Sequence, residues 1–341
     1  MRGKSVSGEP VARMLALLNA CLTTQALHAA ARLGIADELG AAPRSVDDLS
    51  AALGAQADAL DRLMRMLASI GVVSVGHDAT FRLTALGETL RSDSANSVRD
   101  WALYVGASAP WAAWSQLHET VKTGMPGFVL AHGMPTYEFL ESHAELSGSF
   151  NRWMSKQSAQ HNAAIVDAYD FARFGVVADI GGGQGSTLAA VLQRHASVRG
   201  ILFDKPSVVT ESAPPLDAGH LGDRCTVLGG DMLESVPEGA DLYMIKRVLM
   251  IWGDDAAVRV LKNCAARLAP AGKVLVVEMV MPPLGEPGPA TTFDILMLLA
   301  NKGGRIRTLA EFQKLFAAAG LRLDRSIATR SPNVLLEGSL A

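Results

Sequence analysis

A glycine-rich segment, ADIGGGQGS at residues 178–186, lies between an apolar run typical of a strand and a run typical of a helix. Glycine removes the side chain where the backbone must approach a ligand closely. A pyrophosphate-binding fingerprint, G-x-G-x-x-G, needs glycine at the sixth place, but counting from Gly181 places Ser186 there. The segment therefore predicts a ligand at this turn and weakens its interpretation as a pyrophosphate site.

The next two strand-like runs end in acidic residues. Asp204 ends the run RGILFD about twenty residues after the glycine turn, where a carboxylate is placed to bond ribose hydroxyls. Asp231 follows the third run, where it can accept a hydrogen bond from an adenine amine while Met232 packs on the ring. Tight turns with helix N-caps are the alternative interpretation. Three successive strand ends carry the same pattern, which favours an adenosine-containing ligand.

The segment KRVLMIWGDDAAV, residues 246–258, lies where the chemistry is expected. An apolar stretch with strand character is predicted to end at Ile251 and Trp252, and a helix follows. Ligands of open α/β sheets bind at this end of a strand, yet Met250 and its two neighbours carry no group that takes a proton. They are interpreted either as a wall that orients a flat acceptor or as a buried strand end without substrate contact.

The elements around these segments predict an α/β fold. Buried-strand runs alternate with helical stretches after residue 175: VVADI, RGILFD, CTVLGG, DLYMIKRVL and KVLVVEMV. The chain ends with two further strands, in LDRSIATRS and NVLLEGSL, joined by Ser-Pro. This order predicts a mostly parallel sheet covered by helices, with a C-terminal antiparallel hairpin.

Residues 1–100 are predicted to form a separate helical domain with a winged-helix pattern. Ser45 is expected to cap one helix, Gly54 to end it, and VVSVGHDATFRLT to form a hairpin after a second helix. A DNA-recognition helix should be basic, but the charges of the second helix sum to zero. The charged residues are Asp58, Asp61, Arg62 and Arg65. This favours a packing or dimerisation module.

Composition argues against several classes of protein. The formal net charge is −3 without a basic stripe, and the three cysteines have no metal-site or redox spacing. The eight histidines are scattered, which predicts no metal site. The start, MRGKSVSGEP, has no apolar signal core, and no apolar run is judged to approach the roughly 18 residues of a membrane span. We therefore expect a cytoplasmic protein that binds neither nucleic acid nor membrane.

The motifs VVADIGGGQG, ILFDKPSVV and GGDML, followed by the run from DLYMIK to WGDD, resemble a known family in their order and spacing. It is the S-adenosylmethionine-dependent methyltransferases of the caffeate O-methyltransferase type, including bacterial enzymes of polyketide and phenazine biosynthesis. The resemblance covers nearly the whole chain. It implies a class I methyltransferase Rossmann-like domain at 171–341, linking helices at 101–170 that contribute to the acceptor pocket, and a homodimer formed by residues 1–100.

The resemblance also implies S-adenosyl-L-methionine as the cofactor, S-adenosyl-L-homocysteine as its product, and the residues that bind them. The expected cofactor contacts are Asp179, Gly181, Gly183, Gly185, Asp204, Asp231, Met232, Lys246 and Ser158. The expected acceptor contacts are Met154, Met250, Trp252, Met297 and Asn301. One departure is Lys205, where the family has leucine, although its aliphatic stem can still lie under the adenine.

The family's catalytic base is replaced in this chain. In the O-methylating members a histidine deprotonates the acceptor hydroxyl, and alignment through Lys246 and Trp252 places Met250 at that histidine. Glu278 matches one of two glutamates that flank the histidine, and Ile306 replaces the other. Phenazine N-methyltransferases of the family also lack the histidine, so the resemblance still implies methyl transfer.

The missing base restricts the acceptor. A simple phenol has a pKa near 10, so about one molecule in a thousand is ionised at pH 7, at a cost of roughly 4 kcal/mol. A positioned general base recovers about 10²–10⁴ in rate. Without it, we expect methylation of a nitrogen, or of an acidic hydroxyl, on a small aromatic or heteroaromatic metabolite.

Other possibilities remain open from the sequence. His161 lies one turn beyond Ser158 and is a candidate relocated base for a conventional phenol O-methyltransferase. Asp254 and Asp255 are interpreted as helix N-caps rather than as catalytic acids. The intact cofactor motifs also fit a non-methylating cyclase or pericyclase that uses the bound cofactor as a fixed positive charge.

Overall fold

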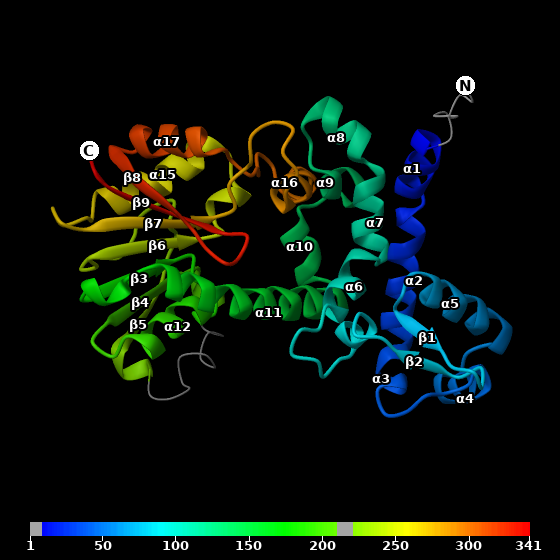
Figure 1. The fold of residues 1–341 in the computed structure, drawn as a ribbon. Helices are drawn as coiled ribbons and strands as arrows, with labels where there is room; N and C mark the ends of the chain where they lie inside the picture. The colour runs from blue at the N-terminus through cyan, green and yellow to red at the C-terminus, as the bar shows by residue number, and fades with distance from the viewer. Residues whose placement is uncertain (1–8, 210–220) are drawn as a thin grey trace, which may run out of the picture. The chain divides into compact units, whose positions relative to one another are not determined.

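The computed structural model describes residues 9–209 and 221–341 (Figure 1). Its contacts divide the chain into two compact units: residues 1–112 with 139–153, and residues 113–138 with 154–341. The segment 101–170, expected to link two domains, is therefore divided between these units. The expectation that the chain start holds no signal core falls largely on residues 1–8, which lie outside the described residues.

The first unit has the helices and hairpin that the sequence predicts. Ser45 forms a capping box with Asp48 at the start of α4, and Gly54 ends that helix with a left-handed backbone. The main elements are α1 (Glu9–Leu18), α2 (Ala20–Leu33), α3 (Ile35–Leu39), α4 (Val46–Leu53), α5 (Ala57–Ser69), β1 (Val73–Val75), β2 (Phe81–Leu83), η1 (Gly87–Leu90) and α6 (Arg99–Val105). Leu60, Met64 and Leu67 of α5 bury one helical face in its core.

Helices α1 and α2 leave a large apolar surface exposed. Its residues are Val11, Met14, Leu15, Leu17, Leu18 and Leu22. The two helices together, residues 9–33, are long and apolar enough to cross a membrane by length and composition. The expectation that no apolar stretch approaches that length is therefore wrong. An apolar surface of this kind is also what a partner subunit covers.

The second unit is built on a seven-stranded sheet of order β5-β4-β3-β6-β7-β9-β8. The strands are β3 (Val176–Ile180), β4 (Arg199–Asp204), β5 (Cys225–Gly229), β6 (Leu242–Lys246), β7 (Lys273–Glu278), β8 (Leu321–Ala328) and β9 (Val334–Leu340). The first five are parallel, and the β8–β9 hairpin adds antiparallel to β7, as predicted. Strand order reverses between β3 and β6, and ligands of open α/β sheets bind at such a switch point.

Helices cover both faces of this sheet, because successive strand residues point to opposite sides. Val177 belongs to the core that α12 covers, whereas Ala178 belongs to the core of α15 and α17 (Figure 1). The helices wholly in this unit are α8 (Leu117–Thr123), α9 (Gly127–His132), α12 (Ser186–Arg194), α13 (Pro206–Val209), α15 (Asp254–Ala265), α16 (Pro289–Ala300) and α17 (Leu309–Ala318). Three helices cross the unit boundaries: α7 (Ser108–Ser115), α10 (Thr136–Glu141) and α11 (Ala144–Ala168).

Strand β6 ends earlier than predicted. It stops at Lys246, and the expectation that it reaches Ile251 and Trp252 is wrong. The reason is Arg247, whose backbone has a φ of 54°, in the left-handed region that interrupts an extended strand. A short 3₁₀ turn, η4 (Leu249–Ile251), follows and carries Met250.

The two aspartates after this turn are not N-caps. Gly253 occupies the N-cap position of α15 without a side-chain cap, and Asp254 and Asp255 lie in the first helical turn. Their negative charge suits the positive end of the helix dipole. Asp254 also accepts a hydrogen bond from Arg307 Nε at 2.9 Å.

Arg307 fixes the turn η4. Its side chain is 1% exposed and donates to the carbonyl oxygens of Leu249 and Trp252, each at 2.8 Å. Arg305, two residues earlier, adds a second contact to the turn, because its backbone N–H donates to the carbonyl oxygen of Met250 at 2.9 Å. The loop before α17 therefore holds the turn through backbone groups rather than through side-chain packing alone.

We expect Arg307→Ala to lower the free energy of unfolding by about 3 kcal/mol, because it leaves two carbonyls and Asp254 without their donor. Urea denaturation measures the change. Arg305→Ala is the matched control, since it keeps the backbone N–H bound to Met250, and the Arg305 side chain forms, among the described residues, only an exposed ion pair with Glu311, worth about 0–1 kcal/mol. Equal losses in the two variants would contradict the assigned role of Arg307.

Candidate active site

The glycine turn after β3 has the backbone shape that only glycine adopts readily. Gly181 and Gly183 have φ values of 70° and 59°. A Cβ on Gly181 would also lie 2.7 Å from Val248 Cγ2 and 2.9 Å from Met232 Cε. The turn is therefore packed closely against Met232, a predicted cofactor contact from the loop after β5.

Asp179, below this turn, is a buried carboxylate without a donor. Neither of its oxygens has a hydrogen-bond partner among the described residues, and the side chain is almost fully buried. Burial raises the pKa of Asp179, and the positive charge of Lys246 opposes that rise. A buried polar group is costly unless it is hydrogen-bonded. The position therefore favours a ligand that brings donors or positive charge.

Lys246, at the end of β6, is held by three oxygens. Its Nζ donates to Ser158 Oγ at 2.5 Å, Asn162 Oδ1 at 2.7 Å and Thr187 Oγ1 at 3.0 Å. Burial lowers the pKa of Lys246, and Asp179 opposes that change. The network brings the end of α11 and the start of α12 to the same sheet edge as the glycine turn.

The two acidic strand ends differ in their surroundings. Asp204 accepts backbone N–H groups from Gly183 at 2.8 Å and Lys205 at 2.7 Å, which ties it to the glycine turn. Asp231 is exposed and accepts the N–H of Leu233 at 2.9 Å. Both carboxylates keep unused lone pairs, because each oxygen can accept more than one hydrogen bond.

Met250 lies in an apolar cluster on turn η4. It is 4% exposed and packs with Met279, Ala290 and Ile306. Partly exposed apolar side chains border this cluster: Ile251, Met281, Phe293 and Met297. Asn301 lies next to this border, with Nδ2 at 3.7 Å from Met297 Sδ. Two other predicted acceptor contacts, Met154 and Trp252, are partly exposed, and Trp252 packs on the neighbouring core.

Glu278 supports the turn from the end of β7. It is fully buried, and its Oε1 accepts the backbone N–H of Met250 at 3.1 Å. Its Oε2 has no partner among the described residues. Burial raises the pKa of Glu278 to about 7, against the opposing charge of Arg247. The carboxyl therefore changes its charge near neutral pH.

His161 is half-buried on α11, one turn beyond Ser158. Burial is the main cause that lowers its pKa below 6.5, and the charges of Arg247 and Lys246 act in the same direction. The imidazole is therefore neutral at pH 7 and can accept a proton. Its electrostatic contact with Lys246 and Arg247 brings it to the edge that holds the other predicted residues.

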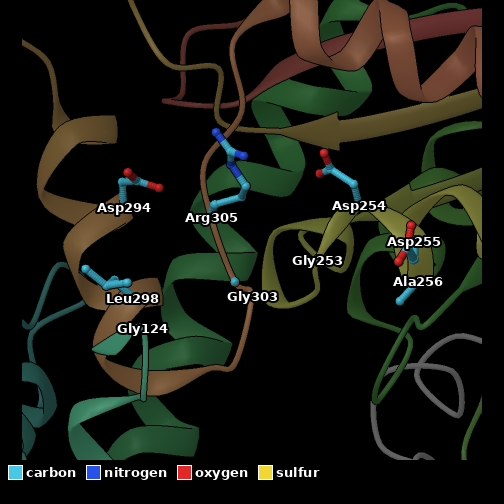
Figure 2. Close-up of a pocket in the computed structure, with 10 residues that line it drawn as sticks. Gly124, Gly253, Asp254, Asp255, Ala256, Asp294, Leu298, Gly303 and Arg305 are labelled. Carbon is cyan, nitrogen blue, oxygen red and sulfur yellow. The ribbon is translucent and has the colours of Figure 1, made fainter. Parts of the chain in front are cut away.

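A separate cavity of about 690 Å³ lies between the start of α15, helix α16 and the loop at 303–305 (Figure 2). None of the predicted cofactor or acceptor residues lines it. Its polar side chains already hold the loop: Arg305 pairs with Glu311, and Asp294 accepts the Ile306 N–H at 2.6 Å. Over residues 9–209 and 221–341, no group of His, Cys, Asp and Glu is arranged for a metal ion.

Several site residues escaped the sequence analysis. Asn162 and Thr187 complete the Lys246 network, and Arg247 and Arg307 surround the turn of Met250. A helical spacing of four from Ser158 would have indicated Asn162. Arg307 follows Ile306 directly, but nothing in the sequence marks it as buried.

Two family models match the chain. An O-methyltransferase dimerisation domain matches residues 15–93, and an O-methyltransferase domain matches residues 114–322. The first match includes most of the apolar α1–α2 segment, which gives its exposed surface an expected partner subunit.

Individual relatives align over most of their lengths. A phenazine O-methyltransferase of Lysobacter antibioticus is 37% identical, over 95% of this chain and 94% of its own. An 8-amino-8-demethylriboflavin N,N-dimethyltransferase of Streptomyces davaonensis is 34% identical, over 86% and 85%. The solved structure of CalO1, a methyltransferase in calicheamicin biosynthesis, contains S-adenosylhomocysteine. It covers 100% of both chains with a TM-score of 0.84 and 35% identity.

The buried carboxyl of Glu278 predicts a pH-dependent stability. Its unfolded form ionises near 4.5, whereas the folded form ionises near 7. Because the unfolded state loses its proton first, the wild type loses free energy of unfolding as pH rises from about 4.5 to about 7. Glu278→Gln keeps an oxygen for the Met250 N–H but cannot ionise. Relative to wild type, we expect it to gain about 2 kcal/mol between pH 5.5 and 8, measured by urea denaturation.

Glu337→Gln is the matched control. Glu337 is also buried, and burial opposes its ionisation, but hydrogen bonds from Arg325 and Tyr169 hold the pKa of Glu337 below its usual value. Its contribution is therefore constant between pH 5.5 and 8. A Glu278→Gln effect that is equally constant would show that Glu278 does not titrate in the folded protein.

Proposed function

This chain belongs to the S-adenosylmethionine-dependent O-methyltransferase family, and we propose that it methylates a nitrogen or an acidic hydroxyl of a small aromatic or heteroaromatic metabolite without a histidine base. The observation that carries the proposal is the apolar cluster around Met250, the residue that the family resemblance implies stands in place of that base. Met250, Met279 and Ile306 are buried together, and none of them accepts a proton. By their names, the relatives include both oxygen and nitrogen methyltransferases, so either acceptor atom lies within the family's range.

The described residues fit the cofactor. When bound, S-adenosylmethionine supplies a methyl group on a positively charged sulfur. The carboxylate of Asp179, which has no hydrogen-bond partner among the described residues, suits a cationic amino group, and the open space beside Gly183 leaves room for a ligand close to the turn. Asp204 and Asp231 offer acceptors for hydroxyl and amine donors, and Lys246 supplies a fixed positive charge.

The protein's own contribution is then positioning. Methyl transfer from a sulfonium is an in-line displacement, and holding the reactants in line supplies about 7–11 kcal/mol of the barrier. Glu278 and Arg307 hold the backbone of the turn that carries Met250. A ring nitrogen with a free lone pair, or an already ionised oxygen, reacts without further proton removal.

The proposal also includes the assembly of the protein and its location in the cell. We propose a homodimer formed through the N-terminal domain, supported by the matched dimerisation domain and by the exposed apolar side chains of α1 and α2. We also keep the expectation of a cytoplasmic enzyme whose ligand is a small aromatic compound.

A conventional phenol O-methyltransferase with a relocated base is the second candidate function. His161 favours it, because its imidazole is neutral near pH 7 and interacts with Lys246 and Arg247. A base with a lowered pKa gives activity that is lost as pH falls through that value, below 6.5.

Incubation with methyl-labelled cofactor and two acceptor series tests the function directly. One series consists of aza-aromatic compounds and the other of hydroxyarenes of graded acidity. Label should appear on ring nitrogens or on the more acidic hydroxyls. Efficient transfer to simple phenols that is lost in His161→Gln would contradict the proposal. Cofactor binding without transfer in either series would favour the non-methylating cyclase instead.

We expect Met250→His to lower turnover on the best acceptor by about tenfold. A histidine buried without a partner costs roughly 1–3 kcal/mol, and neither Ile251 nor Ile306 offers it one. Met250→Leu is the control, since it keeps an apolar side chain of similar size and should retain most activity. A gain of turnover in Met250→His would mean that the native reaction needs a base at this position.

The pH profile separates the two candidate functions. We expect wild-type turnover on a ring nitrogen to stay nearly flat between about pH 6 and 8.5, because no histidine titrates in the chemistry. An acceptor hydroxyl that ionises in this range would produce a rise set by its own pKa. An acidic limb below 6.5 that disappears in His161→Gln would establish His161 as the base; His195→Gln, on another element, is the matched control.

A further inference from the structure

Arg247 carries a positive charge that the fold leaves unpaired. Its guanidinium lies over the ring of Phe293, 5.2 Å from the centroid. It makes no hydrogen bond or ion pair with any described residue. Two other arginines of this unit are held by the protein: Arg307 binds Asp254 and two carbonyls, and Arg224 binds three carbonyls. Arg247 therefore keeps its five donors for another group.

The backbone at Arg247 is held in a conformation that side chains other than glycine rarely adopt. Its φ is 54°, and its N–H donates to the carbonyl oxygen of Val277 at 2.9 Å. Glycine adopts this conformation without strain, so the shape of the turn does not explain an arginine here. Strained positions of this kind concentrate at functional sites, which indicates that the side chain itself has a task.

The groups facing Arg247 neutralise its charge only in part near neutral pH. Glu278 from β7 attracts it, but burial favours the uncharged form of that carboxyl, and Oε1 is already bound to the Met250 N–H. Tyr137 from α10 interacts with it electrostatically, and His161 from α11 is neutral near pH 7. The adjacent Lys246 adds a second positive charge. The surroundings therefore favour an added anion.

We propose that Arg247 binds an ionised oxygen on the aromatic acceptor, which makes the acceptor a hydroxyarene in its phenolate form. Phe293, under the guanidinium, belongs to the partly exposed border of the Met250 cluster. An aromatic ring on this border would place its oxygen beside Arg247. The inference rests on the proposed function and narrows its acceptor from nitrogen or oxygen to oxygen.

A fixed positive charge replaces part of what a general base does. An opposite charge within about 4–6 Å lowers the pKa of an ionisable group by about 1–3 units. For a phenol with a pKa near 10, the ionised fraction at pH 7 then rises from about one in a thousand to between about one in a hundred and one in two. The proton goes to water before methyl transfer begins.

The transfer step then needs no proton acceptor from the protein. A lone pair of the ionised oxygen forms the new oxygen–carbon bond while the sulfur–carbon bond breaks, and that electron pair stays on sulfur. The product is a neutral ether. Because it has lost the charge that Arg247 binds, the product should bind more weakly than the acceptor, which favours its release.

Spectroscopic titration of a bound phenol tests the assignment without measuring activity. The probe is a nitronaphthol, a flat hydroxyarene whose phenolate absorbs visible light, bound to the full-length protein saturated with S-adenosylhomocysteine. In wild type we expect the probe's pKa to fall by about 1–3 units relative to free solution. Arg247→Lys should keep most of that shift, because it keeps the charge. Arg247→Met should abolish it.

Two further variants and one further ligand sharpen the result. Arg247→Gly removes the side chain and relieves the positive φ, so it reports on the charge even where Arg247→Met folds poorly. Arg259→Met, on the exposed face of α15, is the matched control and should behave as wild type. The methyl ether of the probe should bind wild type at least tenfold more weakly than the phenolate, and Arg247→Met should lose this preference.

An unshifted probe pKa in wild type, an equal shift in Arg247→Met and wild type, or no probe binding by cofactor-saturated wild type would each overturn the proposal. The experiments distinguish failure of the Arg247 proposal from failure of the proposed methyltransferase function. A probe shift that depends on Arg247, with no methyl transfer to any acceptor, would sustain the anion site and refute the methyltransferase assignment. Methyl transfer confined to ring nitrogens, with no shift of the probe's pKa, would refute the anion site and sustain the methyltransferase assignment.

Discussion

The fixed turn after β6 is the constraint on which the candidate site depends. Glu278 accepts a backbone N–H near its start, and Arg307 donates to carbonyls at its start and end. A 3₁₀ turn of three residues satisfies few of its own backbone groups, so an apolar segment without these partners would not keep one shape. The two buried ionisable side chains therefore hold Met250 at a defined place inside the apolar cluster.

The buried charges around this turn are placed by their partners, and each partner comes from a distant part of the chain. Lys246 needs oxygens from α11 and α12, and Arg307 needs Asp254 from α15. If one partner were removed, the other would remain as an uncompensated buried charge. The free-energy cost of that charge exceeds what the intact pair contributes to stability. Several helices and loops therefore contribute the residues that line this edge of the sheet. This explains why Asp179, whose oxygens have no hydrogen-bond partner among the described residues, stands out as a ligand position.

The sequence predicted the fold well, because the fold follows from local patterns. Strand periodicity, the glycine turn and the capping box at Ser45 depend on neighbouring residues. The end of β6 was predicted wrongly because apolar residues continue past Lys246, while the interruption comes from the backbone of Arg247. The partner of Asp254 was missed for a different reason. Arg307 is 53 residues away, and no local pattern reveals that it is buried.

The replacements at the family's base position are consistent with one another. A histidine at 250 would need an acceptor for its second nitrogen. Ile251 and Ile306 are apolar, and of the two Glu278 oxygens Oε1 is already bound to the turn, which leaves Oε2 as the one acceptor that this carboxyl could offer. Restoring one residue alone would bury a polar group beside methionine and isoleucine side chains. The buried members of this cluster, Met250, Met279, Ala290 and Ile306, carry no proton-accepting side chain. Under the proposed function, chemistry at this position begins from an acceptor whose reactive lone pair is already free, and Arg247 is the charge that we propose favours such an acceptor.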